Sequence, residues 1–141
     1  MYVGDILRNK SQRAVTIGSS ETISMAASLM RASTIGALVV RNISRSGDAA
    51  VVGMFCERDL VSVIAERGAK GLAKKVSQFI SSRPLLSCNS QDTLVYAEQL
   101  MNRHSVRHLP VIDNGRLVGV ISIRDVASAF DEVAADAVQA A

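Results

Sequence analysis

The stretch Leu109-Pro110-Val111-Ile112-Asp113-Asn114-Gly115-Arg116-Leu117-Val118-Gly119-Val120-Ile121-Ser122-Ile123-Arg124-Asp125 decides how this chain folds. Two runs rich in Leu, Val and Ile flank Asn114-Gly115, a dipeptide typical of tight turns, and this pattern predicts a β-hairpin. The hairpin ends at Ser122, and Asp125 follows three residues later, just before an apolar stretch. A hydroxyl and a carboxylate at this spacing predict a helix start, so a strand passes into a helix at Ser122.

The same unit occurs earlier in the chain. Residues 52–60 match residues 118–126 in apolar pattern, and in both copies a Gly is followed six residues later by an Asp. A second block precedes each copy at a constant offset of 71 residues, with the matching pairs Thr22/Thr93, Leu29/Leu100, Met30/Met101, Ile35/Val106, Leu38/Leu109 and Val40/Val111. The chain is therefore an internal duplication, and its period is too long for a solenoid repeat.

Composition limits the class of protein. The chain has 141 residues, of which 48% are hydrophobic. Two halves of about 70 residues are marginal alone, so we expect them to share one core. The net charge of +3 is too small to indicate a polyanion partner. Cys56 and Cys88 are too few for a disulfide scaffold, no apolar leader precedes Val3, and no apolar run reaches membrane-spanning length. We therefore expect a cytoplasmic protein.

Local patterns predict the elements of the first half. A short helix from Val3 ends in the loop 10–13, and residues 14–17 are extended. The next helix has Ser19 as its predicted N-cap and Glu21 in its first turn, and it stops near Ser33. A strand over 35–40, a loop over 41–50 and a helix over 59–67 complete this half, with Gly68 at the C-cap.

The second half repeats this order. Residues 69–75 are the predicted linker, because they hold three lysines and little that can be buried. A helix over 76–81, an extended segment over 84–86 and a helix capped by Ser90, with Asp92 in its first turn, lead to the hairpin. The expected division is a first motif at 1–68, the linker, a second motif at 76–131 and a helical tail at 132–141.

Together these features resemble a tandem pair of CBS domains. Each half has the order helix, strand, helix, strand, strand, helix, and the runs 105–112 and 119–125 are close to the family pattern. The resemblance covers about residues 1 to 131. It implies an α+β fold in which two CBS motifs pack with pseudo-twofold symmetry into one module with two clefts. It also implies a homodimer of such modules, and in many members the clefts bind AMP, ADP, ATP, NAD or S-adenosylmethionine.

The resemblance and the chemistry of the motif give two sets of candidate binding residues. An exposed helix N-terminus suits a phosphate, Ser122 adds a hydroxyl there, and Asp125 suits the hydroxyls of a ribose. Gly119 permits a close approach to the strand, and Arg107 and Arg124 neutralise phosphate charge. The main cleft comprises Ser122, Asp125, Arg107, His108, Pro110, Arg124 and Gly119, with Ile17, Gly36 and Ala37 as its wall. The second cleft comprises Cys56, Arg58, Asp59, Pro84 and Leu86.

Simpler explanations exist for these residues. Ser-x-x-Asp before a helix is a capping box in its own right. Cys56 replaces the hydroxyl in the first copy, and a thiol is a weak donor, so phosphate binding there is in doubt although Asp59 still suits a ribose. His104 and His108 are four residues apart, but one falls at a helix end and the other in a strand. We therefore expect no zinc site, and His108 is a candidate ligand contact or an exposed histidine.

The sequence therefore predicts a regulatory module rather than an enzyme. It contains no nucleophile elbow, Walker loop, dinucleotide fingerprint or catalytic carboxylate pair. CBS domains also occur in inosine monophosphate dehydrogenase, whose chemistry resides in a separate barrel that this chain lacks. We expect the chain to bind an adenosine nucleotide as a regulatory ligand and to signal through a homodimer to a partner protein. The alternatives are a ligand-independent homodimeric scaffold and, disfavoured by the few aromatics, a nucleic-acid-binding protein.

Overall fold

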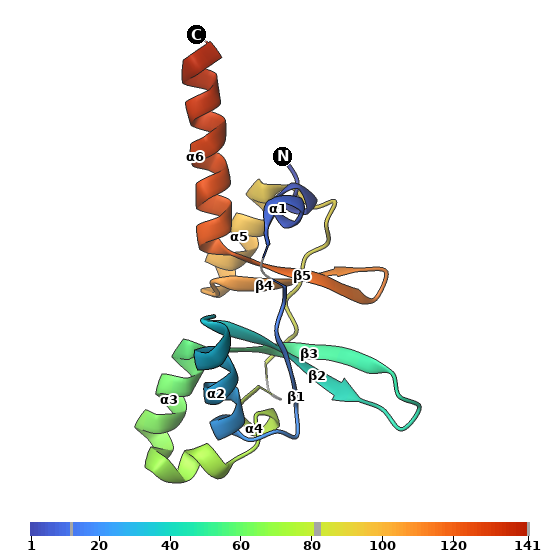
Figure 1. Cartoon of the computed structure of the whole chain (residues 1–141), viewed down its shortest axis with the longest axis vertical. Helices are drawn as coiled ribbons and strands as arrows, with labels where there is room; N and C mark the ends of the chain where they lie inside the picture. The colour runs from blue at the N-terminus through green and yellow to red at the C-terminus, as the bar shows by residue number, and fades with distance from the viewer. Residues whose placement is uncertain (12, 81–82, 141) are drawn as a thin grey trace. The chain divides into compact units, whose positions relative to one another are not determined.

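The computed structural model describes residues 1–11, 13–80 and 83–140, which form two compact units (Figure 1). Unit 1 comprises Met1–Arg13 and Ser87–Ala141, and unit 2 comprises Ala14–Leu86. The chain therefore passes from one unit to the other twice. Both units contain helices and strands, which confirms the α+β class.

Unit 2 is a three-stranded sheet with helices. Its elements are β1 (Thr16–Gly18), α2 (Ile23–Ser33), β2 (Ala37–Ile43), β3 (Ala49–Cys56), α3 (Glu57–Arg67), the 3-10 helix η1 (Gly68–Ala73) and α4 (Ser77–Ile80). The strand order is β1-β2-β3, with β1 parallel and β3 antiparallel to β2. Its core consists of Ile17, Ile23, Ala26, Met30, Leu38, Val40, Phe55, Val63, Val76 and Ile80.

Unit 1 is built around the predicted hairpin. Its elements are α1 (Val3–Asn9), α5 (Leu94–His104), β4 (His108–Asp113), β5 (Arg116–Ser122) and α6 (Ile123–Ala140). Asn114 and Gly115 both have positive φ, 51° and 78°, as a tight two-residue turn requires. The long helix α6 begins directly after β5 and continues past the other elements of its unit (Figure 1). The buried apolar residues of this unit are Val3, Cys88, Leu94, Ala97, Met101, Leu109, Val111, Ile121, Val126 and Ala129.

The duplication is visible in structural detail. Helices α2 and α5 both have 11 residues and begin at equivalent positions. Thr22 and Thr93 cap them, each accepting a hydrogen bond of 3.1 Å from the backbone N–H three residues on. Both helices end in a left-handed residue, Thr34 or Ser105. The same local sequence therefore produces the same helix twice.

The two hairpins share a bulge beside a glycine. The register shifts after Val40 in one hairpin and after Val111 in the other, and these residues pair with Gly53 and Gly119 respectively. Each glycine lies under the short helix that begins a motif. A Cβ built on Gly53 lies 3.4 Å from Ile80 of α4, and one on Gly119 lies 2.7 Å from Leu7 of α1. The space over Gly119 is thus filled by a side chain of the protein.

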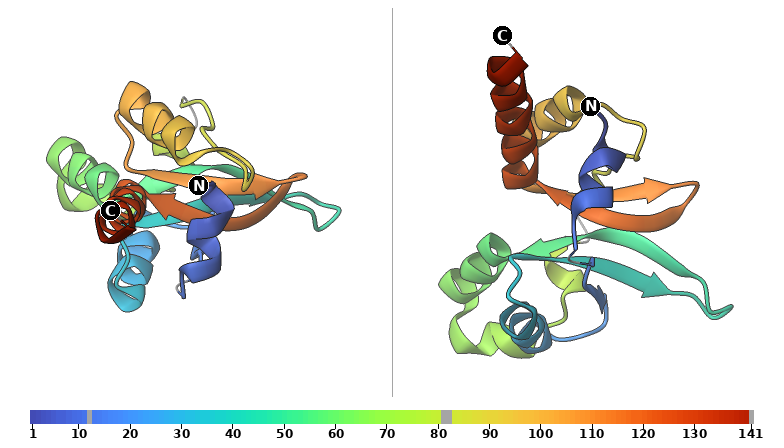
Figure 2. Two further views of the ribbon diagram at one scale, coloured as in Figure 1. Left: turned by 90° about the horizontal axis from the view of Figure 1, so that it is seen from above. Right: turned by 45° about the horizontal axis from the view of Figure 1, so that its top comes forward.

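The short leading helices are exchanged between the two motifs. Helix α1 precedes the first motif in sequence but contacts β5 and α6 in unit 1, as two views of the ribbon show (Figure 2). Helix α4 precedes the second motif but contacts β3 in unit 2. The boundaries of the compact units therefore differ from the boundaries of the sequence repeats.

Two predicted helix caps are wrong. The caps are Thr22 and Thr93, not Ser19 and Ser90, and Glu21 and Asp92 precede the helices instead of lying in their first turns. Each serine lies in the loop that precedes its helix. The N–H of Ser19 donates to the Arg41 carbonyl and that of Ser90 to the Asp113 carboxylate, each at 2.9 Å. Because these hydrogen bonds to distant residues fix the two serines in their loops, the helices begin only after Thr22 and Thr93.

Residues 84–86, which the sequence predicts to be extended, do not form a strand. The strand-like contact of the second motif is a single parallel bridge between Cys88 and Val111, where the first motif has β1 beside β2. In the first motif the N–H of Val39 donates to the carbonyl of Val15 at 3.0 Å. The residue equivalent to Val39 is Pro110, which has no N–H to donate. The proline therefore prevents the pairing from extending toward Leu86.

Three predicted segments differ from the structure in length or place. The predicted loop 41–50 is shorter, because β2 and β3 continue pairing out to Ile43 and Ala49. Residues 69–75, expected to link the motifs, lie in unit 2 and include most of η1, where Gly71 is buried against Val63. The predicted helix 76–81 is observed at Ser77–Ile80, and its last expected residue, Ser81, lies outside the described residues. The tail is helical to Ala140, as predicted.

Candidate functional site

The candidate site in unit 1 is the junction where β5 ends and α6 begins. The backbone N–H of Ser122 donates to Oδ2 of Asp125 at 2.8 Å, and the N–H of Asp125 donates to Oγ of Ser122 at 3.0 Å. This reciprocal pair is the predicted capping box. It fixes the Asp125 carboxylate and the Ser122 hydroxyl beside the positive end of an 18-residue helix.

Lys10 also binds this carboxylate. Its Nζ donates to Oδ2 of Asp125 at 2.8 Å and to the carbonyl of Val120 at 3.0 Å. Lys10 is the residue after α1, so the packing of α1 on β5 brings it to the site. About a quarter of each side chain in this ion pair is exposed, 25% for Lys10 and 24% for Asp125. The ion pair is therefore mostly buried, but a ligand in the solvent can still reach it.

The carboxyl group of Asp125 is ionised at neutral pH. Partial burial acts to raise its pKa, but the hydrogen bond and charge of Lys10, together with the hydrogen bonds to Ser122, outweigh burial and lower the pKa below its usual value. The site therefore presents an anionic acceptor next to hydrogen-bond donors.

The other candidates of unit 1 surround this junction to different degrees. His108 pairs with Ser122 across the hairpin, and the carbonyl of Arg107 accepts the N–H of Ile123 at 2.8 Å. The side chains of Arg107 and Arg124 are exposed, and that of His108 is partly exposed. Pro110 is buried in β4 and pairs with Val120, and Gly119 is covered by Leu7. These last two residues thus support the site from within the sheet.

Unit 2 repeats the arrangement around Cys56. The N–H of Cys56 donates to Oδ2 of Asp59 at 2.8 Å, and the thiol completes the capping box of α3. Nη1 of Arg83 donates to Oδ1 of Asp59 at 2.9 Å. The carbonyl of Gly36 accepts the N–H of Glu57 at 3.0 Å, as the Arg107 carbonyl does in unit 1. The backbone of the junction is therefore the same in both copies.

The two thiols have different surroundings. Cys56 is partly exposed, and burial is the main cause that raises the pKa of its thiol. Cys88 is buried, and burial together with the charges of Asp92 and Asp113 raises its pKa to about 12. Both cysteines are free and protonated at neutral pH, so neither thiol offers the charge or reactivity of a thiolate.

The remaining candidates lie in unit 2. Ile17 is buried in β1 and pairs with Val40, and Ala37 pairs with Cys56 beside Gly36. Pro84 is exposed and Leu86 is partly exposed, both in the segment that follows Arg83. Arg58 is exposed on the first turn of α3. Gly36 and Ala37 thus occupy in unit 2 the positions that Arg107 and His108 occupy in unit 1.

Sequence patterns missed Lys10 and Arg83. Each residue follows the short leading helix of a motif. Its side chain donates a hydrogen bond to the aspartate of a capping box, in the same unit in which that helix packs. The two residues do not match at the repeat offset, so an internal comparison does not reveal them. A basic residue shortly after each leading helix is the only signal that the sequence holds.

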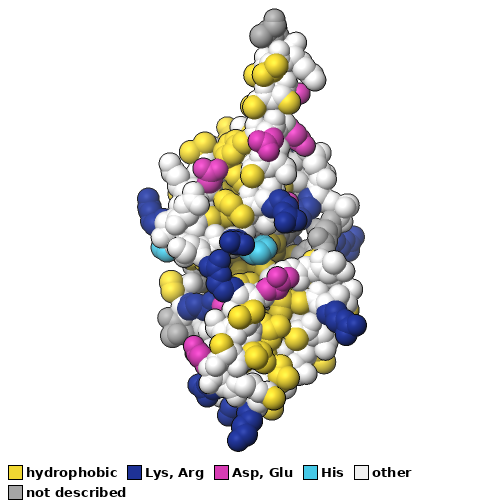
Figure 3. Space-filling model, turned by 90° about the vertical axis from the view of Figure 1, so that its left-hand side faces the viewer, with side chains coloured by type: hydrophobic (Ala, Val, Ile, Leu, Met, Phe, Trp, Pro, Cys, Tyr) yellow, Lys and Arg dark blue, Asp and Glu magenta, His cyan; other side chains and the backbone are white. Residues whose placement is uncertain are grey.

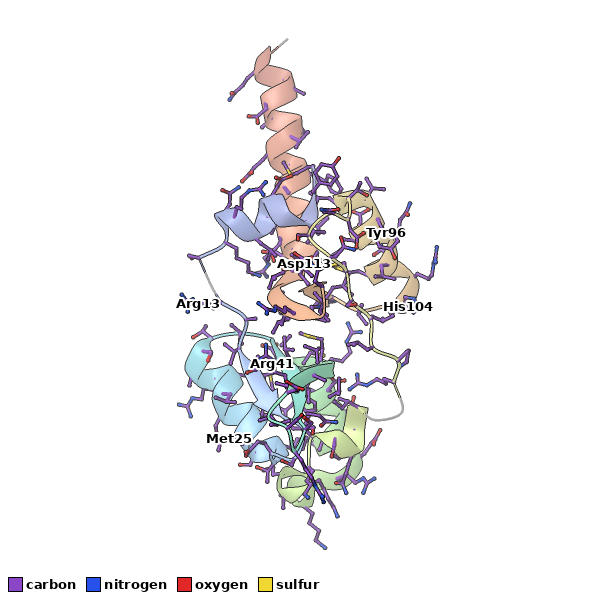
Figure 4. The ribbon with its side chains drawn as sticks, turned by 90° about the vertical axis from the view of Figure 1, so that its right-hand side faces the viewer. Arg13, Met25, Arg41, Tyr96, His104 and Asp113 are labelled. Atoms are coloured by element: carbon purple, nitrogen blue, oxygen red, sulfur yellow. The ribbon has the colours of Figure 1, made fainter. Side chains whose placement is uncertain are left out.

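Among the described residues, no group of three or more His, Cys, Asp or Glu side chains is arranged to hold a metal ion. His104 ends α5, labelled in Figure 4, whereas His108 lies in β4. In the described part of the chain no helix is long and apolar enough to span a membrane.

Comparison with protein families gives a match to the CBS domain model over residues 3–66 and 76–132. The chain belongs to the CBS-domain family. The two matched ranges correspond to the two copies of the repeat and confirm the resemblance drawn from the sequence. CBS-domain protein YhcV of Bacillus subtilis is 33% identical over 115 residues, which cover 82% of this chain and 77% of YhcV. The chain spans only 60 to 64% of the length of three further curated relatives.

Solved structures of CBS-domain proteins have the same fold. The CBS-domain containing protein ATU1752 from Agrobacterium tumefaciens is 38% identical with a TM-score of 0.80, covering 91% of this chain and 92% of that one. CBS domain protein PAE2072 from Pyrobaculum aerophilum, complexed with AMP, is 25% identical with a TM-score of 0.76, covering 89% of each chain. A pair of CBS motifs is thus the shared architecture.

Proposed function

We propose that this CBS-domain chain is a non-catalytic regulatory module that binds an adenosine-containing nucleotide at the start of α6. The observation that carries the proposal is the Asp125 carboxylate, which is ionised and held in place by the N–H of Ser122. A carboxylate offers about four acceptor sites on its two oxygens, enough for two adjacent ribose hydroxyls as well as its cap. The aspartate is therefore the sugar-binding group of the proposed site.

We propose that the phosphate of the ligand binds at the N-terminus of α6. Helix N-termini attract anions, because their first N–H groups lack partners within the helix. In α6 the N–H of Ile123 and that of Asp125 have acceptors, and within the described part of the chain the structure assigns none to the N–H of Arg124. The exposed side chains of Arg107 and Arg124 add positive charge nearby.

The class of ligand is supported by PAE2072, whose structure is complexed with AMP and which is 25% identical to this chain. We extend the proposal to AMP, ADP, ATP and NAD, since all four contain the adenosine group. In the second copy, Asp59 offers the same carboxylate, but Cys56 offers a weak thiol donor in place of the hydroxyl. We therefore propose that the Cys56 copy binds nucleotide more weakly than the Ser122 copy.

The competing proposal is a ligand-independent homodimeric scaffold. Its support is that the capping box satisfies Ser122 and Asp125 within the protein, as a purely structural cap does. Apolar side chains on the second half of α6 are also exposed, including Val133 and Val138. The space-filling view shows hydrophobic side chains on the surface of the helix at its top (Figure 3). Such a surface suits contact with another protein.

Isothermal titration of ligand-free protein with AMP, ATP and NAD tests the proposal. We expect micromolar binding that is lost in Asp125→Ala and kept in Asp131→Ala, an exposed aspartate of the same helix. Asp125→Asn keeps the shape of the side chain and separates loss of charge from loss of fold, and thermal unfolding of each variant checks the latter. Absence of binding to the unaltered protein, or equal binding to all variants, would contradict the proposal.

We also propose that nucleotide binding is transmitted through a homodimer to a partner protein in the cytoplasm. Light scattering after gel filtration, with and without AMP, measures the mass of the assembly. A mass or dimer dissociation constant that changes with AMP supports transmission through the dimer. A dimer that is identical in both conditions favours the scaffold, whose partner is then sought by pull-down.

A further inference from the structure

A cation is bound to the aspartate of each motif. Lys10 binds Asp125 in unit 1, and Arg83 binds Asp59 in unit 2. Both cations lie close to the places where the chain passes between the units, because Lys10 comes three residues before the crossing after Arg13, and Arg83 three residues before the crossing after Leu86. Figure 4 labels Arg13 on the segment after α1.

The two ion pairs differ in which carboxylate oxygen they use. In unit 1, Lys10 and the N–H of Ser122 both donate to Oδ2 of Asp125. In unit 2, Arg83 donates to Oδ1 of Asp59 and the N–H of Cys56 donates to Oδ2. Each carboxylate oxygen has two acceptor sites. Among the hydrogen bonds of the described residues, Oδ2 of Asp125 accepts two and is filled, whereas each oxygen of Asp59 accepts one.

This difference has a consequence for a ribose. Two adjacent hydroxyls that bind a carboxylate side by side need one acceptor site on each oxygen. At Asp125 one of the two present donors must then leave Oδ2. The N–H of Ser122 is part of the helix cap, so the mobile donor is the side chain of Lys10, which has a flexible four-carbon stem.

We propose that Lys10 is a built-in competitor of the nucleotide, which holds Asp125 when the site is empty and is displaced when the ribose binds. The inference rests on the proposed function of Asp125. Lys10 connects the segment after α1 to the capping box of α6. When the ribose displaces Lys10, this connection is lost. Ligand binding is therefore coupled to the segment through which the chain leaves unit 1. Arg83 need not leave, because within the described part of the chain each oxygen of Asp59 accepts one hydrogen bond, which leaves room for a ribose beside Arg83.

The first test is a titration with adenosine, which carries no charge and so does not respond to the loss of a distant lysine. The variants are Lys10→Met and, as a control for charge, Lys70→Met on the exposed part of η1 in unit 2. Removing the competitor should tighten adenosine binding about two- to fivefold, the range expected from a partly exposed ion pair. Lys70→Met should bind as the unaltered protein does.

The second test uses trypsin, which must take the lysine side chain into its own pocket to cut after Lys10. Adenosine should speed cleavage of the Lys10–Ser11 bond and leave cleavage after Lys70 unchanged. Most ligands protect the chains that they bind, so the direction of the effect is diagnostic.

Equal or weaker binding of adenosine to Lys10→Met would overturn the competition while leaving the proposed function intact. Slower or unchanged cleavage after Lys10 would do the same. Weaker binding of AMP with unaltered binding of adenosine would instead make Lys10 a phosphate ligand and also overturn the proposal. If neither adenosine nor AMP binds the unaltered protein or any variant, the proposed function itself fails, and the role of Lys10 fails with it.

Discussion

Replacing Gly119 by alanine tests how α1 packs onto the second hairpin. The new Cβ would lie 2.7 Å from Cδ2 of Leu7, 3.3 Å from its Cδ1 and 3.5 Å from its Cγ. A contact under 3 Å cannot persist, so Leu7 must move. Overpacking of this kind costs about 1–3 kcal/mol, and the stiffer unfolded chain returns about 0.4–1 kcal/mol. We expect Gly119→Ala to lower the free energy of unfolding by about 1.3 kcal/mol, the difference between the midpoints of these two ranges.

Gly53 provides a matched control in the other copy. It occupies the same position opposite a bulge, and its new Cβ would lie 3.4 Å from Cδ1 of Ile80, at the edge of ordinary contact. Gly53→Ala should therefore leave stability within about 0.5 kcal/mol of the parent or raise it slightly. The different result at equivalent glycines follows from the different neighbours.

The assay is urea unfolding followed by tyrosine emission and far-UV circular dichroism. Both tyrosines, Tyr2 and Tyr96, belong to unit 1, so their emission reports the unit that contains Gly119. In a Leu7→Ala background the penalty of Gly119→Ala should nearly vanish, since the clashing side chain is gone. The reasoning is refuted if Gly119→Ala and Gly53→Ala are equally stable, or if the penalty persists without Leu7.

Three further results are expected. Thr22→Ala and Thr93→Ala should each lower the free energy of unfolding by about 1 kcal/mol, because each removes a helix cap. Because the folded-state pKa of Asp125 is lowered, its contribution to stability is present above the unfolded value of 3.8 and is lost as pH falls through the folded value; the stability difference between the parent and Asp125→Asn should therefore shrink in acid. Iodoacetamide at pH 8 should modify Cys56 faster than Cys88, whose pKa is raised to about 12 in a buried position.

Each of these results has a contradicting outcome. Ser19→Ala or Ser90→Ala costing more than the threonine variants would show that the caps are misplaced. A difference between the parent and Asp125→Asn that stays constant from pH 7 to pH 2 would show that Asp125 has an ordinary pKa in the folded protein. Equal rates of alkylation in native protein, read by mass spectrometry of peptides, would show that Cys88 is accessible.

Local patterns predicted the features that depend on neighbouring residues. The turn at Asn114-Gly115, the transition from strand to helix at Ser122 and the capping box with Asp125 are all as predicted, because each depends on a few consecutive residues. The helix caps were wrong for an instructive reason. Ser19 and Ser90 have the right chemistry for caps, but their backbone groups bind Arg41 and Asp113, which are more than twenty residues away.

The sequence by itself determined the duplicated CBS motif, the order of its helices and strands, and the aspartate at the start of each final helix. Repeated spacing and local hydrogen bonding encode these features directly. Only the tertiary structure decided that α1 packs on the sheet of the second motif, that Pro110 limits pairing beside Cys88, and that Lys10 binds Asp125. A lysine and an aspartate 115 residues apart meet because a packed helix carries one to the other, and no local pattern records that contact.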